Sequence, residues 1–348
     1  MASKEDIAKI LVPRSQRIDE SLKELLPSTD SASSPEIKRY YEGVWDYNLR
    51  GGKRLRPALC MLSCSMFGGN EEDAVPTARS LELLQNFLLV HDDIEDESEL
   101  RRGKPALHLL HGIGSAINIG DALHIYLWKS LLENKKLIGA TKAFAVFREF
   151  VNQSLTTAEG QAIEIAWIRD GKFDVTEDEY FELVSKKTAN YTITTPLRLG
   201  AIVAGAPKRD ADAFNQLGER LGKAFQIQDD VLNITASGEG YGKEAVGDLY
   251  EGKRTLMLVH LLKKLKGEER DEVIRLLAQP RNEKTPEQMQ RVAELLKEKG
   301  SIDYAKKKAA DLAVKAREGF DKKFSSVEEN ESKKALRELF DFLVNREY

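Results

Sequence analysis

Apolar residues recur at intervals of three and four along most of the chain, which is the spacing of one face of an α-helix. One such face comprises Phe144, Val146, Phe147, Phe150, Val151 and Leu155. The two-residue alternation between turns that predicts strands is scarce. The pattern therefore predicts an all-α fold.

Proline positions indicate where the longest helices can lie. No proline occurs between residues 105 and 196 or between residues 207 and 280. Because a proline inside a helix removes a backbone hydrogen bond and clashes with the preceding turn, these gaps predict long helices. The Ser/Pro-rich segment 27–36 and the loop that follows the charged helix in 267–290 are too short to tether two domains. We expect a single domain over residues 1–348.

The composition limits the possible partners. Hydrophobic residues make up 41% of the chain, and 53 Lys and Arg residues nearly balance 57 Asp and Glu residues. With a net charge of -4, the overall field favours neither nucleic acid nor an acidic membrane surface. No segment reaches the roughly eighteen apolar residues of a membrane span, and the first residues lack the pattern of a signal peptide. We therefore expect a cytoplasmic protein with no nucleic-acid partner and no transmembrane segment.

A cluster of acids follows directly on an apolar run in the segment HDDIEDESELRR, residues 91–102. On a helix, Asp92 and Asp96 lie one turn apart on the same face. Two bare carboxylates about 6 Å apart repel each other by roughly 2 to 3 kcal/mol at an effective dielectric constant of 20. A helix that leaves the core can also become polar because it is solvated, so this cluster alone leaves both interpretations open.

A second acidic pair follows a second apolar run. The segment FQIQDDVLNI, residues 225–234, carries Asp229 and Asp230, with Asn233 one turn later. Oxygen ligands without His or Cys suit Mg²⁺, which proteins typically hold with one or two carboxylates and the phosphates of a substrate. The repeated pattern therefore predicts a phosphate ligand bridged by Mg²⁺.

A phosphate site also needs free cations. The chain offers basic residues close to other motif-like segments, although each alone is more often a surface group than part of a site. They are Lys53, Arg56, Arg101, Arg102, Lys187, Lys243 and Lys253.

Six segments in unbroken order resemble the motifs of the trans-isoprenyl diphosphate synthases, also called polyprenyl synthetases. They are GGKRLRP, HDDIEDESELRRGKPALH, GQAIE, SKKTA, FQIQDDVLN and GKEAVGDLYEGKRT, within residues 45–260. A lone DDxxD is a weak signal, whereas six motifs in order with fitting gaps are specific. The resemblance implies a single bundle of long helices around a deep central cavity, usually in a homodimer, with the acidic clusters facing each other across its mouth.

The resemblance also implies an activity, the head-to-tail condensation of isopentenyl diphosphate with allylic prenyl diphosphates. In this family the allylic diphosphate ionises, the double bond of isopentenyl diphosphate attacks the carbocation, and a proton is lost. Asp92, Asp96 and Asp229 match the family's Mg²⁺ ligands, with Asp93 and Asp230 in support.

Further residues match the two diphosphate pockets of the family. Those for the allylic diphosphate are Arg101, Lys187 and Lys253, with Lys243 nearby. Those for the metal-free diphosphate of isopentenyl diphosphate are Lys53, Arg56, Gln85 and Arg102. Thr188 and Gln226 are also expected to bind substrate. Two positions depart from the family pattern: Gln85 stands where many bacterial relatives have His, and Asn233 replaces the last aspartate of the second cluster.

The helix before the first acidic cluster is expected to set the product length. Leu88 and Leu84 lie one and two turns before Asp92, and Phe87 lies five residues before it. An aromatic residue at that fifth position, without an insertion in the motif, resembles archaeal-type geranylgeranyl diphosphate synthases. Farnesyl synthases tend to have a second aromatic residue where this chain has Leu88, or the insertion. Geranylgeranyl diphosphate is the expected product, with farnesyl or longer products as alternatives, and simple core packing is the alternative for Phe87.

Other classes of protein share parts of this pattern. A terpene cyclase also has a helical cavity and a DDxxD cluster, but it needs no second aspartate cluster and no segment such as GGKRLRP. A non-catalytic regulatory subunit of a prenyl synthase generally loses carboxylates or basic groups that this chain keeps. A purely structural scaffold would not need unpaired acids at the ends of two apolar runs.

Overall fold

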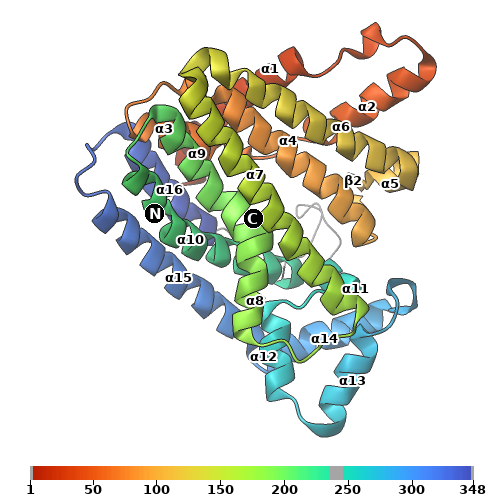
Figure 1. The fold of residues 1–348 in the computed structure, drawn as a ribbon. Coiled ribbons are helices and arrows are strands. Elements are labelled where there is room, and N and C mark those ends of the chain that lie inside the picture. The colour runs from red at the N-terminus through yellow and green to blue at the C-terminus, as the bar shows by residue number, and fades with distance from the viewer. Residues whose placement is uncertain (1–2, 236–245, 346–348) are drawn as a thin grey trace.

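The computed structural model describes residues 3–235 and 246–345, and most of them lie in helices, which confirms the all-α prediction (Figure 1). The main helices are α1 (Lys4–Leu25), α2 (Pro35–Leu49), α3 (Leu55–Met66), α4 (Glu71–Glu95), α5 (Leu107–His111), α6 (Ile113–Leu132), α7 (Asn134–Arg169), α8 (Glu177–Val184), α9 (Thr195–Ala204), α10 (Lys208–Thr235), α11 (Gly247–Glu251), α12 (Leu256–Lys264), α13 (Gly267–Leu277), α14 (Pro286–Glu298), α15 (Ser301–Lys323) and α16 (Glu331–Asn345). The short turns η1 (Thr29–Ser31) and η4 (Arg281–Glu283) and the π-helical segment η2 (Ser185–Thr194) complete them. Strands β1 (Leu100–Arg101) and β2 (Lys104–Pro105) pair antiparallel in one hairpin.

Local sequence signals explain where many helices begin. The proline-free gaps hold α7, of 36 residues with a kink at Gly139, and α10, of 28 residues. Capping boxes at Ser3, Thr176 and Thr285 start α1, α8 and α14 by satisfying backbone N–H groups that have no partner within the helix. The predicted loop 27–36 is shorter than expected, because Ser34 caps α2 and Pro35 is its first residue.

The helices pack around two groups of buried side chains. In one group α10 packs against α15 and η2, and in the other α4 packs against α6 (Figure 1). Helix α3 lies against both α4 and α9 and contributes to both groups, with Leu59 and Leu62 in the first and Cys60 and Cys64 in the second. Within the described residues, no helix has the length and the apolar character needed to cross a bilayer.

The segment η2 is held closely on two sides by glycines. A Cβ on Gly160 of α7 would lie 2.4 Å from the backbone N of Lys187, and a Cβ on Gly222 of α10 would lie 2.5 Å from Cα of Ala189. Only a residue without a side chain permits such an approach of two backbones. The two glycines therefore fix where η2 presents Lys187. π-Helical turns of this kind are frequent at functional sites.

We predict that Gly160→Ala destabilises the protein by about 1–3 kcal/mol, because the added methyl group forces α7 and η2 apart. The melting temperature in thermal denaturation should fall by several degrees. Gly114→Ala is the matched control, because a Cβ at Gly114 meets no atom within 4 Å, and it should leave the melting temperature unchanged or slightly raised. Equal melting temperatures for both variants would show that η2 can shift without cost.

Candidate active site

A cavity of about 610 Å³ opens between α4, α7, η2 and α10. It brings together most of the residues predicted as a site: Arg56, Gln85, Phe87, Leu88, Asp92, Arg101, Arg102, Lys187, Thr188, Gln226, Asp229, Asp230 and Lys253. Lys53, Leu84, Asp93 and Asp96 are not among the lining residues. Lys243 lies outside the residues that the structure describes. The two acidic segments, far apart in the sequence, thus share one cavity.

Three carboxylates gather at the end of α4. Oxygen atoms of Asp92, Asp96 and Glu164 lie within 4.8 Å of one another, so the predicted common face of Asp92 and Asp96 is present. Glu164 lies one turn after Gly160 in the segment GQAIE, and its sequence context alone gave this acid no role. A donor set made only of carboxylate oxygens fits a hard divalent cation such as Mg²⁺.

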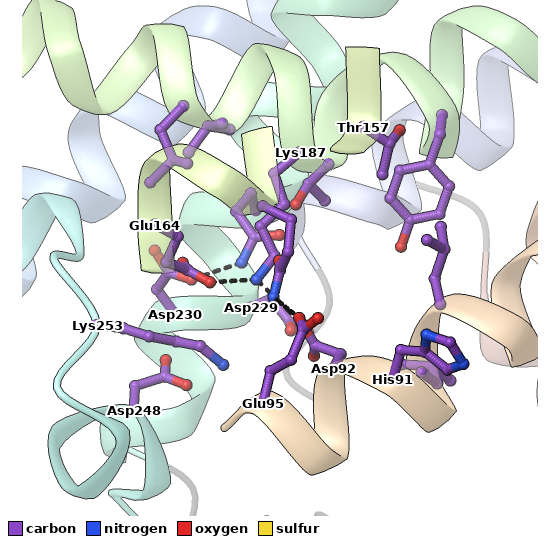
Figure 2. Close-up of a pocket in the computed structure, with 18 of the residues that line it drawn as sticks. His91, Asp92, Glu95, Thr157, Glu164, Lys187, Asp229, Asp230, Asp248 and Lys253 are labelled. Carbon is purple, nitrogen blue, oxygen red and sulfur yellow. Dashed lines mark hydrogen bonds and ion pairs between the residues drawn. The ribbon is translucent and has the colours of Figure 1, made fainter. Parts of the chain in front are cut away.

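Buried lysines offset the repulsion among these acids. Nζ of Lys187 lies 3.0 Å from Oδ1 of Asp92 and is also paired with Glu164, so its side chain projects between the two carboxylates (Figure 2). Nζ of Lys253 lies 2.8 Å from Oδ2 of Asp96 and 2.5 Å from Oε2 of Glu251. Cations and carboxylates therefore alternate at the mouth of the cavity.

The same charges shift the pKa values of the acidic residues in opposite directions. Burial acts to raise the pKa of Asp92, but Lys187, Lys253 and Arg101 together hold it below its usual range. Burial, with the negative charges of Asp92 and Glu251, raises the pKa of Asp96 to about 8 against the effect of Lys253. For Lys187, burial opposes the charged form, yet the carboxylates raise its pKa. The ammonium group of Lys187 thus stays charged at neutral pH.

The second aspartate of each acidic pair has a different environment from the first. Asp93 accepts hydrogen bonds from the Tyr47 hydroxyl at 2.5 Å and from Nε of Arg101 at 2.9 Å. Asp230 accepts hydrogen bonds from the Tyr180 hydroxyl at 3.0 Å and from Nε2 of Gln226 at 2.7 Å. Both acids are buried, and each accepts a hydrogen bond from a tyrosine of another helix, behind the cavity wall for Asp93 and at the wall for Asp230. Sequence reasoning did not single out either tyrosine.

The amide of Asn233, which stands in place of the family's aspartate, binds backbone. Oδ1 of Asn233 accepts a hydrogen bond from the N–H of Asp248 at 3.1 Å. The backbone carbonyl of Asn233 accepts one from the N–H of Val246 at 3.0 Å. Asn233 thereby fixes the start of α11, whose Asp248 lines the cavity. Asp248 is a further site residue that sequence reasoning did not identify.

Basic and polar groups also line the cavity, namely Arg56, Gln85 and Arg102. Nη2 of Arg56 donates to Oγ1 of Thr192 at 2.7 Å, and Nη1 of Arg102 donates to the carbonyl of Tyr47 at 2.6 Å. Oε1 of Gln85 is buried and has no hydrogen-bond partner within the described part of the chain. A buried acceptor of this kind is costly unless a ligand or water satisfies it.

The two basic residues before Arg56 lie elsewhere. Lys53 is exposed, and its Nζ lies 5.1 Å from the centre of the Phe342 ring. Arg54 is only 3% exposed, and it donates to Asp19 at 2.9 Å, to Glu82 at 2.7 Å and to the carbonyl of Asn48 at 2.6 Å. Within GGKRLRP, Arg54 therefore connects α1, α2 and α4 through hydrogen bonds, and Arg56 lines the cavity.

The residues expected to set the product length separate into two groups. Phe87 and Leu88 line the cavity, and the Phe87 ring stacks on His124 of α6 with 4.6 Å between ring centres. Leu84 is 1% exposed and packs in the core instead. Leu84 lies eight residues, about 12 Å along the helix axis, before Asp92, which is beyond every residue of α4 that lines the cavity.

Comparisons with known proteins agree with this geometry. The chain matches the family described as Polyprenyl synthetase over residues 38–296. It is 33% identical to a geranylgeranyl diphosphate synthase of Sulfolobus acidocaldarius over 90% of this chain and 92% of the relative. It is 30% identical to a geranylfarnesyl diphosphate synthase of Natronomonas pharaonis over 100% of both chains. Among solved structures, a geranylgeranyl pyrophosphate synthetase of Pyrococcus horikoshii matches with a TM-score of 0.84 and 31% identity over 98% of each chain.

These matches identify an all-α enzyme of the prenyltransferase class. Within that class, the chain belongs to the polyprenyl synthetase family, as its motifs indicate. The names of these relatives refer to products of different lengths, so they do not fix the product of this chain.

The different positions of Arg54 and Arg56 give a testable contrast. Arg54→Ala removes the guanidinium 2.7 Å from the buried Glu82 and leaves only that of Arg102, 3.9 Å away, so we expect a loss of about 3–5 kcal/mol in the free energy of unfolding. Arg56→Ala should leave the unfolding transition nearly unchanged and reduce kcat/KM by at least about tenfold. Denaturant unfolding and steady-state kinetics of both variants distinguish the two effects. A reversed pattern would contradict a structural role for Arg54 and a cavity role for Arg56.

Proposed function

We propose that this prenyltransferase condenses isopentenyl diphosphate head-to-tail with allylic prenyl diphosphates and releases mainly geranylgeranyl diphosphate. The observation that carries the product length is the position of Phe87 on the cavity wall, with the smaller Leu88 beside it. The name of the Sulfolobus acidocaldarius relative supports the same product. Farnesyl and longer-chain diphosphates are the alternatives, and chain-length analysis of the product distinguishes them.

We assign the carboxylates at the cavity mouth to Mg²⁺ binding. Asp92, Asp96 and Asp229 would hold the metal, and Glu164 is a further candidate because its oxygen lies in the same group as those of Asp92 and Asp96. Bound Mg²⁺ would neutralise negative charge on the departing diphosphate. Asp93 and Asp230 would support these ligands from the buried side, since both are engaged by tyrosines.

Three cations would hold the allylic diphosphate. Arg101, Lys187 and Lys253 line the cavity next to the carboxylates, and Thr188 and Gln226 lie on the same wall. Fixed positive charges in a partly enclosed site stabilise the negative charge that grows as the bond to the diphosphate breaks. The apolar wall beyond them would receive the hydrocarbon and exclude water from the carbocation.

A separate group would bind the diphosphate of isopentenyl diphosphate. Arg56, Gln85 and Arg102 line the same cavity, and arginine is suited to binding phosphate with two parallel hydrogen bonds. Lys53 is exposed and is not among the cavity-lining residues, and Lys243 lies outside the residues that the structure describes, so substrate contact by these two lysines remains a prediction.

We further propose that residues 1–348 act as one domain in a homodimer. Large apolar side chains are exposed on α6 and α7, namely Ile117, Ile125, Leu132, Phe144 and Phe147. Several large exposed apolar side chains on two neighbouring helices favour a face that is covered in an oligomer.

The first experiment incubates the purified protein with Mg²⁺, labelled isopentenyl diphosphate and, in turn, dimethylallyl, geranyl and farnesyl diphosphate. We expect a dominant twenty-carbon product from chain-length analysis, and its complete loss on addition of EDTA. Products of fifteen carbons or of much longer chains would support the condensation reaction and refute the proposed twenty-carbon product. No incorporation from any starter would favour a regulatory subunit over the proposed synthase.

We predict that Phe87→Ala lengthens the main product by at least one isoprene unit, because loss of the ring extends the cavity toward His124. The measurement is the chain-length distribution at equal conversion. Val314→Ala is the control, because this side chain is 57% exposed, does not line the cavity and lies outside the proposed dimer face. An unchanged distribution in Phe87→Ala would place the end of the cavity at another residue.

A further inference from the structure

The hairpin that carries Arg101 and Arg102 is held by the last turn of α2 and the residue after it. Nη1 of Arg50 donates to the carbonyl of Arg101 at 2.9 Å. The Tyr47 hydroxyl accepts the N–H of Leu107, just beyond the hairpin, at 3.2 Å. The two arginines belong to different proposed diphosphate sites, so α2 supports both sites from outside the cavity. No residue of α2 belongs to the motifs or to the cavity lining.

Tyr47 is linked to Arg101 and to Arg102 through different atoms. Its hydroxyl donates to Oδ2 of Asp93 at 2.5 Å, and Asp93 accepts from Nε of Arg101 at 2.9 Å. Its backbone carbonyl accepts from Nη1 of Arg102 at 2.6 Å. The hydroxyl thus acts on Arg101 through a carboxylate, and the carbonyl acts on Arg102 directly.

Because this network is buried, Asp93 needs the Tyr47 hydroxyl as a hydrogen-bond donor. Tyr47 is 1% exposed and Asp93 is 0% exposed, so water does not replace a missing hydrogen bond there. A buried carboxylate needs its full set of donors. Nε and Nη2 of Arg101 both donate to Asp93, and Nη2 also lies 3.9 Å from Asp92 at the cavity. Without the hydroxyl, Arg101 would be the remaining donor to Asp93, so the carboxylate would hold the guanidinium more tightly and leave it less able to bind a diphosphate.

We propose that Tyr47 is a positioning residue for both diphosphate sites, its hydroxyl orienting Arg101 through Asp93 and its carbonyl holding Arg102. This inference rests on the proposed function for the roles of the two arginines. Because the two ends of Tyr47 are chemically independent, one substitution can remove the first support and keep the second.

Tyr47→Phe is that substitution, since it removes the hydroxyl and retains the ring and the backbone carbonyl. We expect kcat/KM for the allylic diphosphate to fall about tenfold, which corresponds to ~1.4 kcal/mol, while KM for isopentenyl diphosphate changes by less than about twofold. Tyr41→Phe makes the same chemical change on the same helix and should alter neither value. Equal losses for both substrates would indicate a general structural role and overturn the proposal.

A binding measurement tests the route through Arg101 independently of turnover. Calorimetry with inorganic diphosphate and Mg²⁺ is applied to the wild type, Tyr47→Phe, Arg101→Gln and the double variant. If the hydroxyl acts through Arg101, Tyr47→Phe binds diphosphate more weakly than the wild type does. The double variant then binds it as strongly as Arg101→Gln alone. Losses that multiply, or unchanged binding in Tyr47→Phe, would refute the inference. Failure of the wild type to form product would instead count against the proposed synthase reaction.

Discussion

The site depends on the balance of charge at the end of α4. Asp92, Asp96 and Glu164 would repel one another strongly in a partly buried location, and Lys187 and Lys253 make their arrangement possible. The lysines reach the carboxylates because η2 and the segment before α12 are fixed by backbone contacts. The close approach at Gly160 and the bond from Asn233 to Asp248 are therefore as much a part of the site as the charges themselves.

Helix geometry explains why the two aspartates of each acidic pair have different partners. A pair of adjacent aspartates on a helix cannot point in one direction, because successive residues are about 100° apart around the axis. In both clusters the first aspartate lines the cavity and the second is hydrogen-bonded to a buried tyrosine, although Asp230 also lines the cavity. The second acid thus connects the site to a neighbouring helix, α2 for Asp93 and α8 for Asp230.

Much of this could be predicted from the sequence, and the rest could not for physical reasons. Helical spacing places Asp92 with Asp96 correctly, but it does not show how far the cavity extends along α4, and Leu84 lies beyond the last lining residue of that helix. Spacing also gives no information on partners that are distant in the chain. Tyr47 lies 46 residues from Asp93, and Tyr180 lies 50 residues from Asp230, so neither contact has a local signal. The separation of Arg54 from Arg56 likewise depends on Asp19 and Glu82, which come from other helices.

Helix α3 contributes side chains to both buried groups, and its first turn carries Arg56 at the cavity. Two cores that share one element cannot open independently, because the loss of α3 from one core removes it from the other. The molecule should therefore unfold as a cooperative unit, and a ligand bound at Arg56 would protect backbone amides in both halves from exchange with solvent. The energetic connection between the halves lies in this twelve-residue helix.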